Sequence, residues 1–383
     1  MKTMPSESPQ KVSAACDSGT ILGEDNRGIA HSPNRIPWPD AARGLLIAGV
    51  VIHHSIVMQA PSPCRTVLLR YDYAILLPFF MQAFFFLSGF CSNFRKPFPR
   101  FVRDDFRTLL LPAILSSLII AAIHSELSAG KAVDIVLHLG ARWFLVALAL
   151  SKIAIWCTMR MKPFLRPSTA IVLSLSGIVL GIKMPEKNIL WLFQGLSMSF
   201  FVWLGVFFRR HDVLDHPPHR FLPVPGCSFL WLLAVAGFLA SRVNPPWFGF
   251  SFRLTTLQIP VSVAMALGGI FAVSGLSRLL DKTLAGAALR RLGRASLVVY
   301  LVHWEFLRLF LPLLERWVPA AGMAPQPAVS VLLPVLATAA SFVVAVILDF
   351  RFARWMLGRK EPSTARISAG RSGDGGERPE EKG

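Results

Sequence analysis

Charged residues are scarce in this chain. They make up 16% of its 383 residues, whereas an average soluble domain carries about a quarter. Hydrophobic residues make up 53% and gather in long runs. Such runs exclude an ordinary soluble domain and indicate an integral membrane protein with many spans.

Cysteine is also scarce, and the common nucleotide and metal motifs are missing. The five cysteines are scattered, without a CxxC or a Cys/His pairing, which supports neither a disulfide framework nor a zinc site. The sequence has no P-loop, dinucleotide fingerprint, HExxH or GxSxG segment. We therefore expect neither nucleotide hydrolysis nor a bound metal.

The net charge of +18 raises the question of a nucleic-acid partner. The basic residues lie in short loops between apolar runs, where membrane topology requires them. We therefore expect membrane lipid around the chain, and no nucleic acid.

The chain divides into two polar tails and one apolar region. Residues 1–34 and 359–383 are rich in Ser, Gly, Pro and charge, and we expect both tails to be disordered. Residues 35–358 form one predicted transmembrane domain, an all-α polytopic helix bundle with about ten spans. The predicted spans lie near 42–60, 74–94, 108–123, 135–157, 168–183, 189–208, 226–242, 257–277, 295–314 and 328–348.

The charges of the loops predict the orientation of these spans. If the N-terminus is cytoplasmic, the loops on its side carry twenty Lys and Arg residues, against eight in the opposite loops. This excess predicts that both termini are cytoplasmic.

The first span contains residues that an apolar helix does not need. Arg43 stands at its predicted cytoplasmic mouth, and His54 follows eleven residues later. Eleven residues rise about 16 Å and close about three turns, so the two side chains share a face. Asp40 lies one turn before Arg43. Topology anchoring for Arg43 and helix packing for His54 are the alternatives to a functional site, and for the adjacent His53 we favour packing.

The ninth span places a second histidine at a similar depth. His303 lies about 12 Å from the predicted cytoplasmic end, with Tyr300 one turn before it on the same face. Intramembrane ionisable groups are usually paired or face a wet cavity, so His54 and His303 could flank one polar cavity. Glu305 and Arg308 lie three residues apart, and we favour mutual neutralisation for this pair.

Three further groups are candidates for binding. Ser88 and Gly89 interrupt a Phe-rich run, where close helix packing is the alternative role. A basic cluster follows in "FRKPFPRFVRDDFR", a good site for a nucleotide diphosphate or a simple topology anchor. In the fourth span Arg142, in "ARWFLVALAL", lies deep enough to need a partner. The alternative for Arg142 is an ion pair with no chemistry.

Taken together, four segments resemble the membrane-bound acyltransferase-3 family, in particular its fucose-acetylase-like or nodulation-type branch. "RIPWPDAARGLLIAGVVIHHS" resembles the first-helix pattern of a basic residue, ten residues and a histidine. "FFFLSGF" is similar to the second-helix motif, "RWFLVALAL" to a Trp-Phe-Leu segment, and "LGRASLVVYLVHWEFL" to a late Gly-x-x-Ser…Tyr-x-x-His segment. The residues that match are Arg43, His54, Phe85, Phe86, Ser88, Gly89, Trp143, Gly293, Ser296, Tyr300 and His303.

The resemblance implies transfer of an acetyl or other acyl group from cytoplasmic acetyl-CoA to a sugar hydroxyl. It implies a glycan or lipid-linked sugar as acceptor, in a bacterial inner membrane, with polysaccharide-assembly proteins as further partners. The expected residues are His54, Arg43, Asp40, Tyr300 and His303 for catalysis, Arg100, Arg103, Arg107, Ser88 and Gly89 for acetyl-CoA, and Arg142, Trp143 and Glu305 for the acceptor.

Two other functions fit the same residues. In a transporter or flippase for a glycan or lipid-linked sugar, the buried histidines and arginines would form a proton or anion path. In a sensor or scaffold of polysaccharide assembly, substitution of Arg43 and His54 would leave the phenotype intact. Labelled acetyl-CoA separates the first two functions, because only an enzyme would leave covalent label on a glycan.

Overall fold

The computed structural model describes residues 36–124, 142–184, 191–211, 224–241, 258–320 and 325–348. Both predicted tails lie outside these residues, and so does the end of the predicted domain after residue 348. Within the described ranges the secondary structure is helical and contains no strand. The prediction of an all-α fold is confirmed.

The described helices follow one another closely along the chain. The first half contains α1 (Trp38–Met58), α2 (Pro63–Ile75), α3 (Phe80–Cys91), α4 (Phe98–Asp105), the π-helix η1 (Phe106–Leu110), α5 (Leu111–Ile123) and α7 (Trp143–Thr158). The second half contains the 3₁₀ turn η3 (Pro163–Leu165), α8 (Arg166–Lys183), α9 (Leu192–Ser197), α10 (Ser199–Arg210), α11 (Val224–Ser241), α12 (Gln258–Leu279), α13 (Leu284–Arg294), α14 (Ser296–Ala320) and α15 (Pro325–Ile347).

The apolar helices have the lengths that a polytopic membrane bundle requires. Eight helical stretches of the described chain are long and apolar enough to cross a membrane, and Trp143–Thr158 and Gly226–Ser241 are shorter apolar helices. Each of the predicted spans overlaps one of these helices, so the bundle is confirmed. The count of ten and the cytoplasmic placement of both termini stay predictions.

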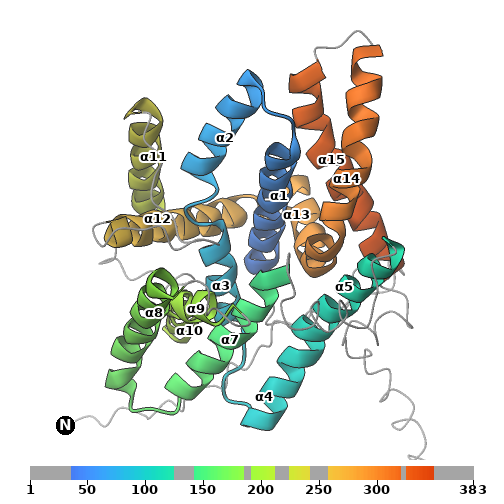
Figure 1. Cartoon of the computed structure of the whole chain (residues 1–383). Helices are drawn as coiled ribbons and strands as arrows, with labels where there is room; N and C mark the ends of the chain where they lie inside the picture. Colours follow the sequence, from blue (N-terminus) through green and yellow to red (C-terminus); the bar gives the residue numbers. More distant parts are fainter. Residues whose placement is uncertain are drawn as a thin grey trace, which may run out of the picture.

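Helix α1 lies in the middle of the bundle (Figure 1). It contacts α2, α3, α12, α13, α14 and α15, and Ala41, Ala42 and Val51 on it are fully buried. We call the end of the bundle where α1 begins the near end, and the end where α1 finishes the far end. The central position of α1 brings its polar side chains within reach of most other helices.

Two close helix crossings fix the helices that carry the candidate residues. A Cβ atom on Gly293 would collide with the carbonyl oxygen of Asp40, so the end of α13 lies directly against the start of α1. A Cβ atom on Gly89 would collide with the carbonyl oxygen of Val202, so α3 and α10 touch backbone to backbone. Small residues at such crossings are typical of membrane helices, because van der Waals packing drives their association.

Candidate active site

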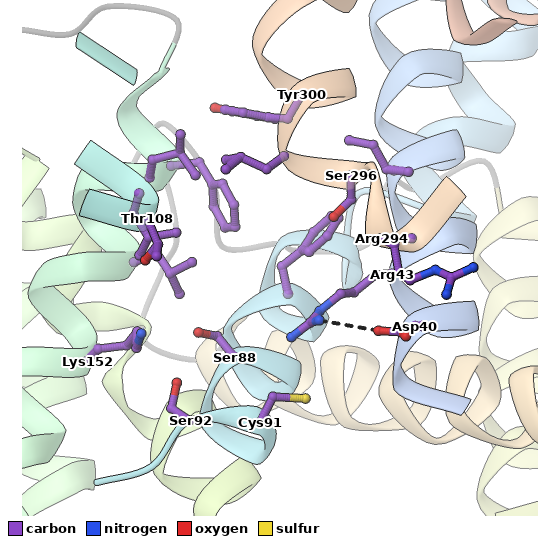
Figure 2. Close-up of a pocket in the computed structure, with 18 residues that line it drawn as sticks. Asp40, Arg43, Ser88, Cys91, Ser92, Thr108, Lys152, Arg294, Ser296 and Tyr300 are labelled. Carbon is purple, nitrogen blue, oxygen red and sulfur yellow. Dashed lines mark ion pairs between the residues drawn. The ribbon is translucent and has the colours of Figure 1, made fainter. Parts of the chain in front are cut away.

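A cavity of about 260 Å³ penetrates the bundle from the near end. Its walls are the start of α1, the end of α3, η1, α7 and the junction of α13 with α14. Figure 2 shows the polar side chains gathered around it. Those labelled are Asp40, Arg43, Ser88, Cys91, Ser92, Thr108, Lys152, Arg294, Ser296 and Tyr300.

Two cations approach the cavity from opposite walls, Arg43 from α1 and Lys152 from α7 (Figure 2). Arg43 lies 3.6 Å from the carboxylate of Asp40, one turn earlier on α1. The ammonium of Lys152 hydrogen-bonds the carboxylate of Asp105 at the end of α4. Both members of this second pair are more than 90% buried. The cavity therefore has a basic side chain on each side, each beside one carboxylate, that an anionic ligand could contact.

Aromatic rings close the far end of this cavity. On each of α3, α7 and α14, one aromatic residue lies farther from the near end than the other lining residues of that helix. These residues are Phe84, Phe144 and Tyr300, respectively. The ring of Phe144 lies 5.5 Å from those of both Phe84 and Tyr300. We call these three residues the aromatic floor. The histidines one turn farther into the membrane do not line this cavity.

Two histidines meet just beyond the aromatic floor. His54 Nδ1 lies 2.8 Å from His303 Nε2, and the rings stack with 5.1 Å between their centroids. The Tyr300 ring centroid lies 6.0 Å from that of His303. The equal depth predicted for His54 and His303 thus corresponds to a direct contact between α1 and α14. We call this pair, together with the adjacent His53, the histidine layer.

The surrounding hydrogen bonds determine which nitrogen of each ring carries the proton. His303 Nδ1 lies 3.0 Å from the carbonyl oxygen of Val299 and 2.8 Å from that of Tyr300. A carbonyl only accepts, so in the neutral ring Nδ1 carries the hydrogen and Nε2 has a lone pair. His54 Nδ1 must then donate to that lone pair. The remaining nitrogen of His54, Nε2, is left with a lone pair and has no recorded protein partner in the described part of the chain.

The structure distributes the predicted catalytic residues over two adjacent places. Asp40, Arg43 and Tyr300 line the cavity. His54 and His303 are outside its lining, one turn beyond the floor. The single cavity expected from the sequence is therefore divided by the aromatic floor, and Tyr300 belongs to both places.

The residues predicted to bind the donor are also divided. Ser88 lines the cavity, whereas Gly89 lies in the contact of α3 with α10. Arg100, Arg103 and Arg107 are exposed on α4 and η1 and do not line the cavity. The cavity takes its positive charge from other residues, and contact of the three arginines with the donor stays a prediction.

The residues predicted to contact the acceptor lie nearer the far end. Arg142 immediately precedes α7 and donates to the carbonyl oxygen of Leu301 over 3.4 Å. Residues 135–141 of the predicted fourth span lie outside the described residues. Trp143 packs against the ring of Trp191. Glu305 lies 3.0 Å from His124 and 3.9 Å from Arg308, so the expected neutralisation involves a histidine as well.

Two polar side-chain pairs between helices were missed by the reasoning from sequence. One is Lys152 with Asp105, and the other is His53 with Asp72, whose Nδ1 and Oδ2 atoms are 2.6 Å apart. Lys152 and Asp105 could have been found by asking which charged residues in or beside apolar segments need a partner. Asp72 lay just outside the predicted second span, whereas α2 and α3 together form one apolar stretch, Pro63–Cys91.

Comparison with known proteins identifies the class of this bundle. The model of the acyltransferase-3 family, described as an acyltransferase domain, matches residues 36–350. Neither a curated protein nor a solved structure matches the chain significantly.

Proposed function

Because the chain belongs to the acyltransferase-3 family, we propose that it moves an acetyl group from acetyl-CoA to a sugar hydroxyl of a surface or secreted glycan. The family and the apolar helices make it a multi-pass membrane acyltransferase. We place it in the fucose-acetylase-like or nodulation-type branch and in a bacterial inner membrane. A lipid-linked sugar is the other form in which the acceptor could be presented.

The orientation of His54 is the observation that carries this proposal. Its Nδ1 donates to His303, so its Nε2 lone pair is available to accept a proton. A histidine held in this way is the usual general base at neutral pH. His303 acts as the positioning residue, as the third member does in a catalytic triad.

The reaction is written as one acyl transfer with balanced protons. The sugar oxygen attacks the thioester carbonyl while His54 Nε2 takes the hydroxyl proton. A new carbon–oxygen bond forms, the carbon–sulfur bond breaks, and His54 returns the proton to the sulfur of CoA. Tyr300, on the cavity side of the histidines, is suited to donate a hydrogen bond to the oxygen that becomes negative.

The near-end cavity is the proposed path of the donor. Arg43 and Lys152 would attract the anionic donor from opposite walls, with Ser88 and Thr108 between them as polar partners. The thioester would have to pass the aromatic floor to reach His54, so we expect Tyr300 and Phe144 to move apart when the donor binds. Arg100, Arg103 and Arg107, outside the cavity, are proposed to hold the phosphates of CoA.

The acceptor would approach His54 from the far end. Arg142, Trp143 and Glu305 are proposed to contact the sugar there. Polysaccharide-assembly proteins would deliver it.

A labelling experiment tests the proposal and separates it from transport. Membranes carrying the wild-type chain or His54→Ala, at matched abundance, are incubated with acetyl-CoA labelled in the acetyl group. We expect covalent label on glycan with the wild-type chain, and a loss of about 100-fold to 10,000-fold with the variant, the range for removal of a general base. Uptake of label without covalent transfer, or full activity of the variant, would contradict the proposal.

A further inference from the structure

A second histidine beside His54 is held in the same way by a different helix. His53 Nδ1 lies 2.6 Å from Asp72 Oδ2, and a carboxylate can only accept. The hydrogen therefore sits on Nδ1, and in the neutral ring Nε2 keeps a lone pair. The expectation from sequence was that His53 is a packing residue; the geometry instead resembles the orienting contact of a catalytic histidine.

The side chain of His53 is partly exposed, whereas that of its partner Asp72 is buried. The side chain of Asp72 is 1% exposed and that of His53 is 16% exposed. Phe80 covers one side of the His53 ring, with 5.9 Å between centroids. No described residue is recorded as a partner of His53 Nε2. Part of the His53 side chain is thus accessible from outside the protein.

A structural role alone does not account for this pair. Burying a carboxylate with its hydrogen-bond partner is often no more stabilising than packing apolar side chains of the same volume. In addition, Asp72 Oδ1 is buried without a hydrogen-bond partner among the described residues. Buried polar atoms of this kind are rare and call for an explanation. The burial of Asp72 is therefore costly, and a role in positioning His53 through Oδ2 gives a reason to keep it.

The position of His53 indicates which ligand. Its ring centroid lies 5.1 Å from that of His54, and the rings are anchored by different helices, α2 and α14. Two histidine rings this close can each contact a different hydroxyl group of one sugar ring. Both hydroxyls would act as donors, which suits two nitrogens that accept.

We propose that His53, positioned by Asp72, binds a second hydroxyl of the acceptor sugar beside the hydroxyl that reacts at His54. This inference rests on the proposed transfer to a sugar. It makes His53 a residue that determines acceptor specificity, and Asp72 a positioning residue that acts through it.

Two amide variants of His53 separate the ligand contact from the contact with Asp72. In His53→Asn the amide can still donate to Asp72 from near the Nδ1 position, but nothing occupies the Nε2 position. In His53→Gln with Asp72→Asn, the longer amide reaches the Nε2 position and no buried carboxylate is left unpaired. The first variant keeps the anchor and loses the ligand contact, and the second does the reverse.

The test measures the KM of each substrate separately with purified protein in detergent. The acceptor probe is polysaccharide from cells lacking this chain, stripped of acyl groups with mild alkali, and the donor is acetyl-CoA. For His53→Asn we expect the acceptor KM to rise about tenfold, the effect of one lost hydrogen bond, at unchanged acetyl-CoA KM. For the double variant we expect an acceptor KM within about threefold of wild type.

The outcomes distinguish this inference from the proposed function. An unchanged acceptor KM in His53→Asn, or an equal rise in both KM values, would overturn the role of His53 while transfer by the wild-type protein still stands. No transfer by the wild-type protein would overturn both.

Discussion

The near-end cavity and the histidine layer hold their polar groups in different ways. In the cavity, Arg43 and Lys152 each lie beside one carboxylate and face the opening from opposite walls. Beyond the aromatic floor, His53 and His54 are each fixed through Nδ1 by another helix. The first arrangement suits a long anionic ligand that must enter and leave. The second fixes single nitrogen atoms, as proton transfer requires.

The largest effect is expected from displacing α1, because this helix carries residues of both the near-end cavity and the histidine layer. Gly293→Ala places a methyl group against the carbonyl oxygen of Asp40. Because backbone atoms are on both sides of this contact, we expect a loss of about 3 kcal/mol or more, the upper range for overpacking. Folded protein recovered from detergent extracts by size-exclusion chromatography should fall strongly.

The matched control for that substitution is Gly237→Ala on α11. A Cβ atom there meets no other atom within 4 Å. We expect recovery equal to that of the wild-type protein. Equal recovery of Gly293→Ala would mean that the α1–α13 contact is looser than described.

The next largest effect should come from His303, the residue that orients His54. His303→Leu removes the acceptor of the His54 Nδ1–H bond, so we expect kcat to fall about 100-fold. His303→Gln can present an amide oxygen to His54 and should lose less. The acetyl-CoA KM should not change in either variant, because His303 lies beyond the cavity. A rise in that KM with unchanged kcat would place His303 in the donor site instead.

Substitutions in the near-end cavity should change the acetyl-CoA KM more than kcat. Arg43→Gln removes a cation that lines it, and we expect the acetyl-CoA KM to rise about tenfold with a smaller change in kcat. Arg103→Gln removes one of the arginines proposed to hold the CoA phosphates, and because Arg103 is exposed and outside the lining we expect a smaller rise in the acetyl-CoA KM. A larger effect at Arg103 than at Arg43 would shift donor recognition to the basic cluster of α4.

The smallest effect should come from the ion pair nearest the far end. Glu305 and His124 have side chains 26% and 44% exposed, and pairs of this kind contribute about 0–1 kcal/mol. Glu305→Gln should therefore leave the thermal midpoint in detergent nearly unchanged. A large drop in that midpoint would show that the pair is structural.

Much of the fold follows from the sequence because apolar runs translate directly into membrane helices. The equal depth of His54 and His303 was also predictable, since rise per residue gives depth once the side of origin is assumed. Their hydrogen bond was not, because depth does not say which helices are neighbours. The resemblance to the family singled out His54 and His303 as catalytic residues, but it did not predict how their side chains are arranged.

The parts that sequence reasoning missed depend on contacts between distant segments. Lys152 and Asp105 lie 47 residues apart, and His53 and Asp72 lie 19 apart on different helices. A donor site was predicted at Arg100, Arg103 and Arg107 because these residues are close together in the sequence. Arg43 and Lys152 come from separate helices, α1 and α7, and only the folded bundle places them on opposite walls of one cavity.

The most direct test of the account is the chemical step in His54→Asn. The asparagine amide can still donate to His303 from near the Nδ1 position, so the local contact is kept while the Nε2 lone pair is lost. With both substrates saturating, we predict that single-turnover transfer slows about 1,000-fold while acetyl-CoA binds as tightly as to the wild-type protein. Transfer at the wild-type rate would contradict the assignment of His54 Nε2 as the proton acceptor.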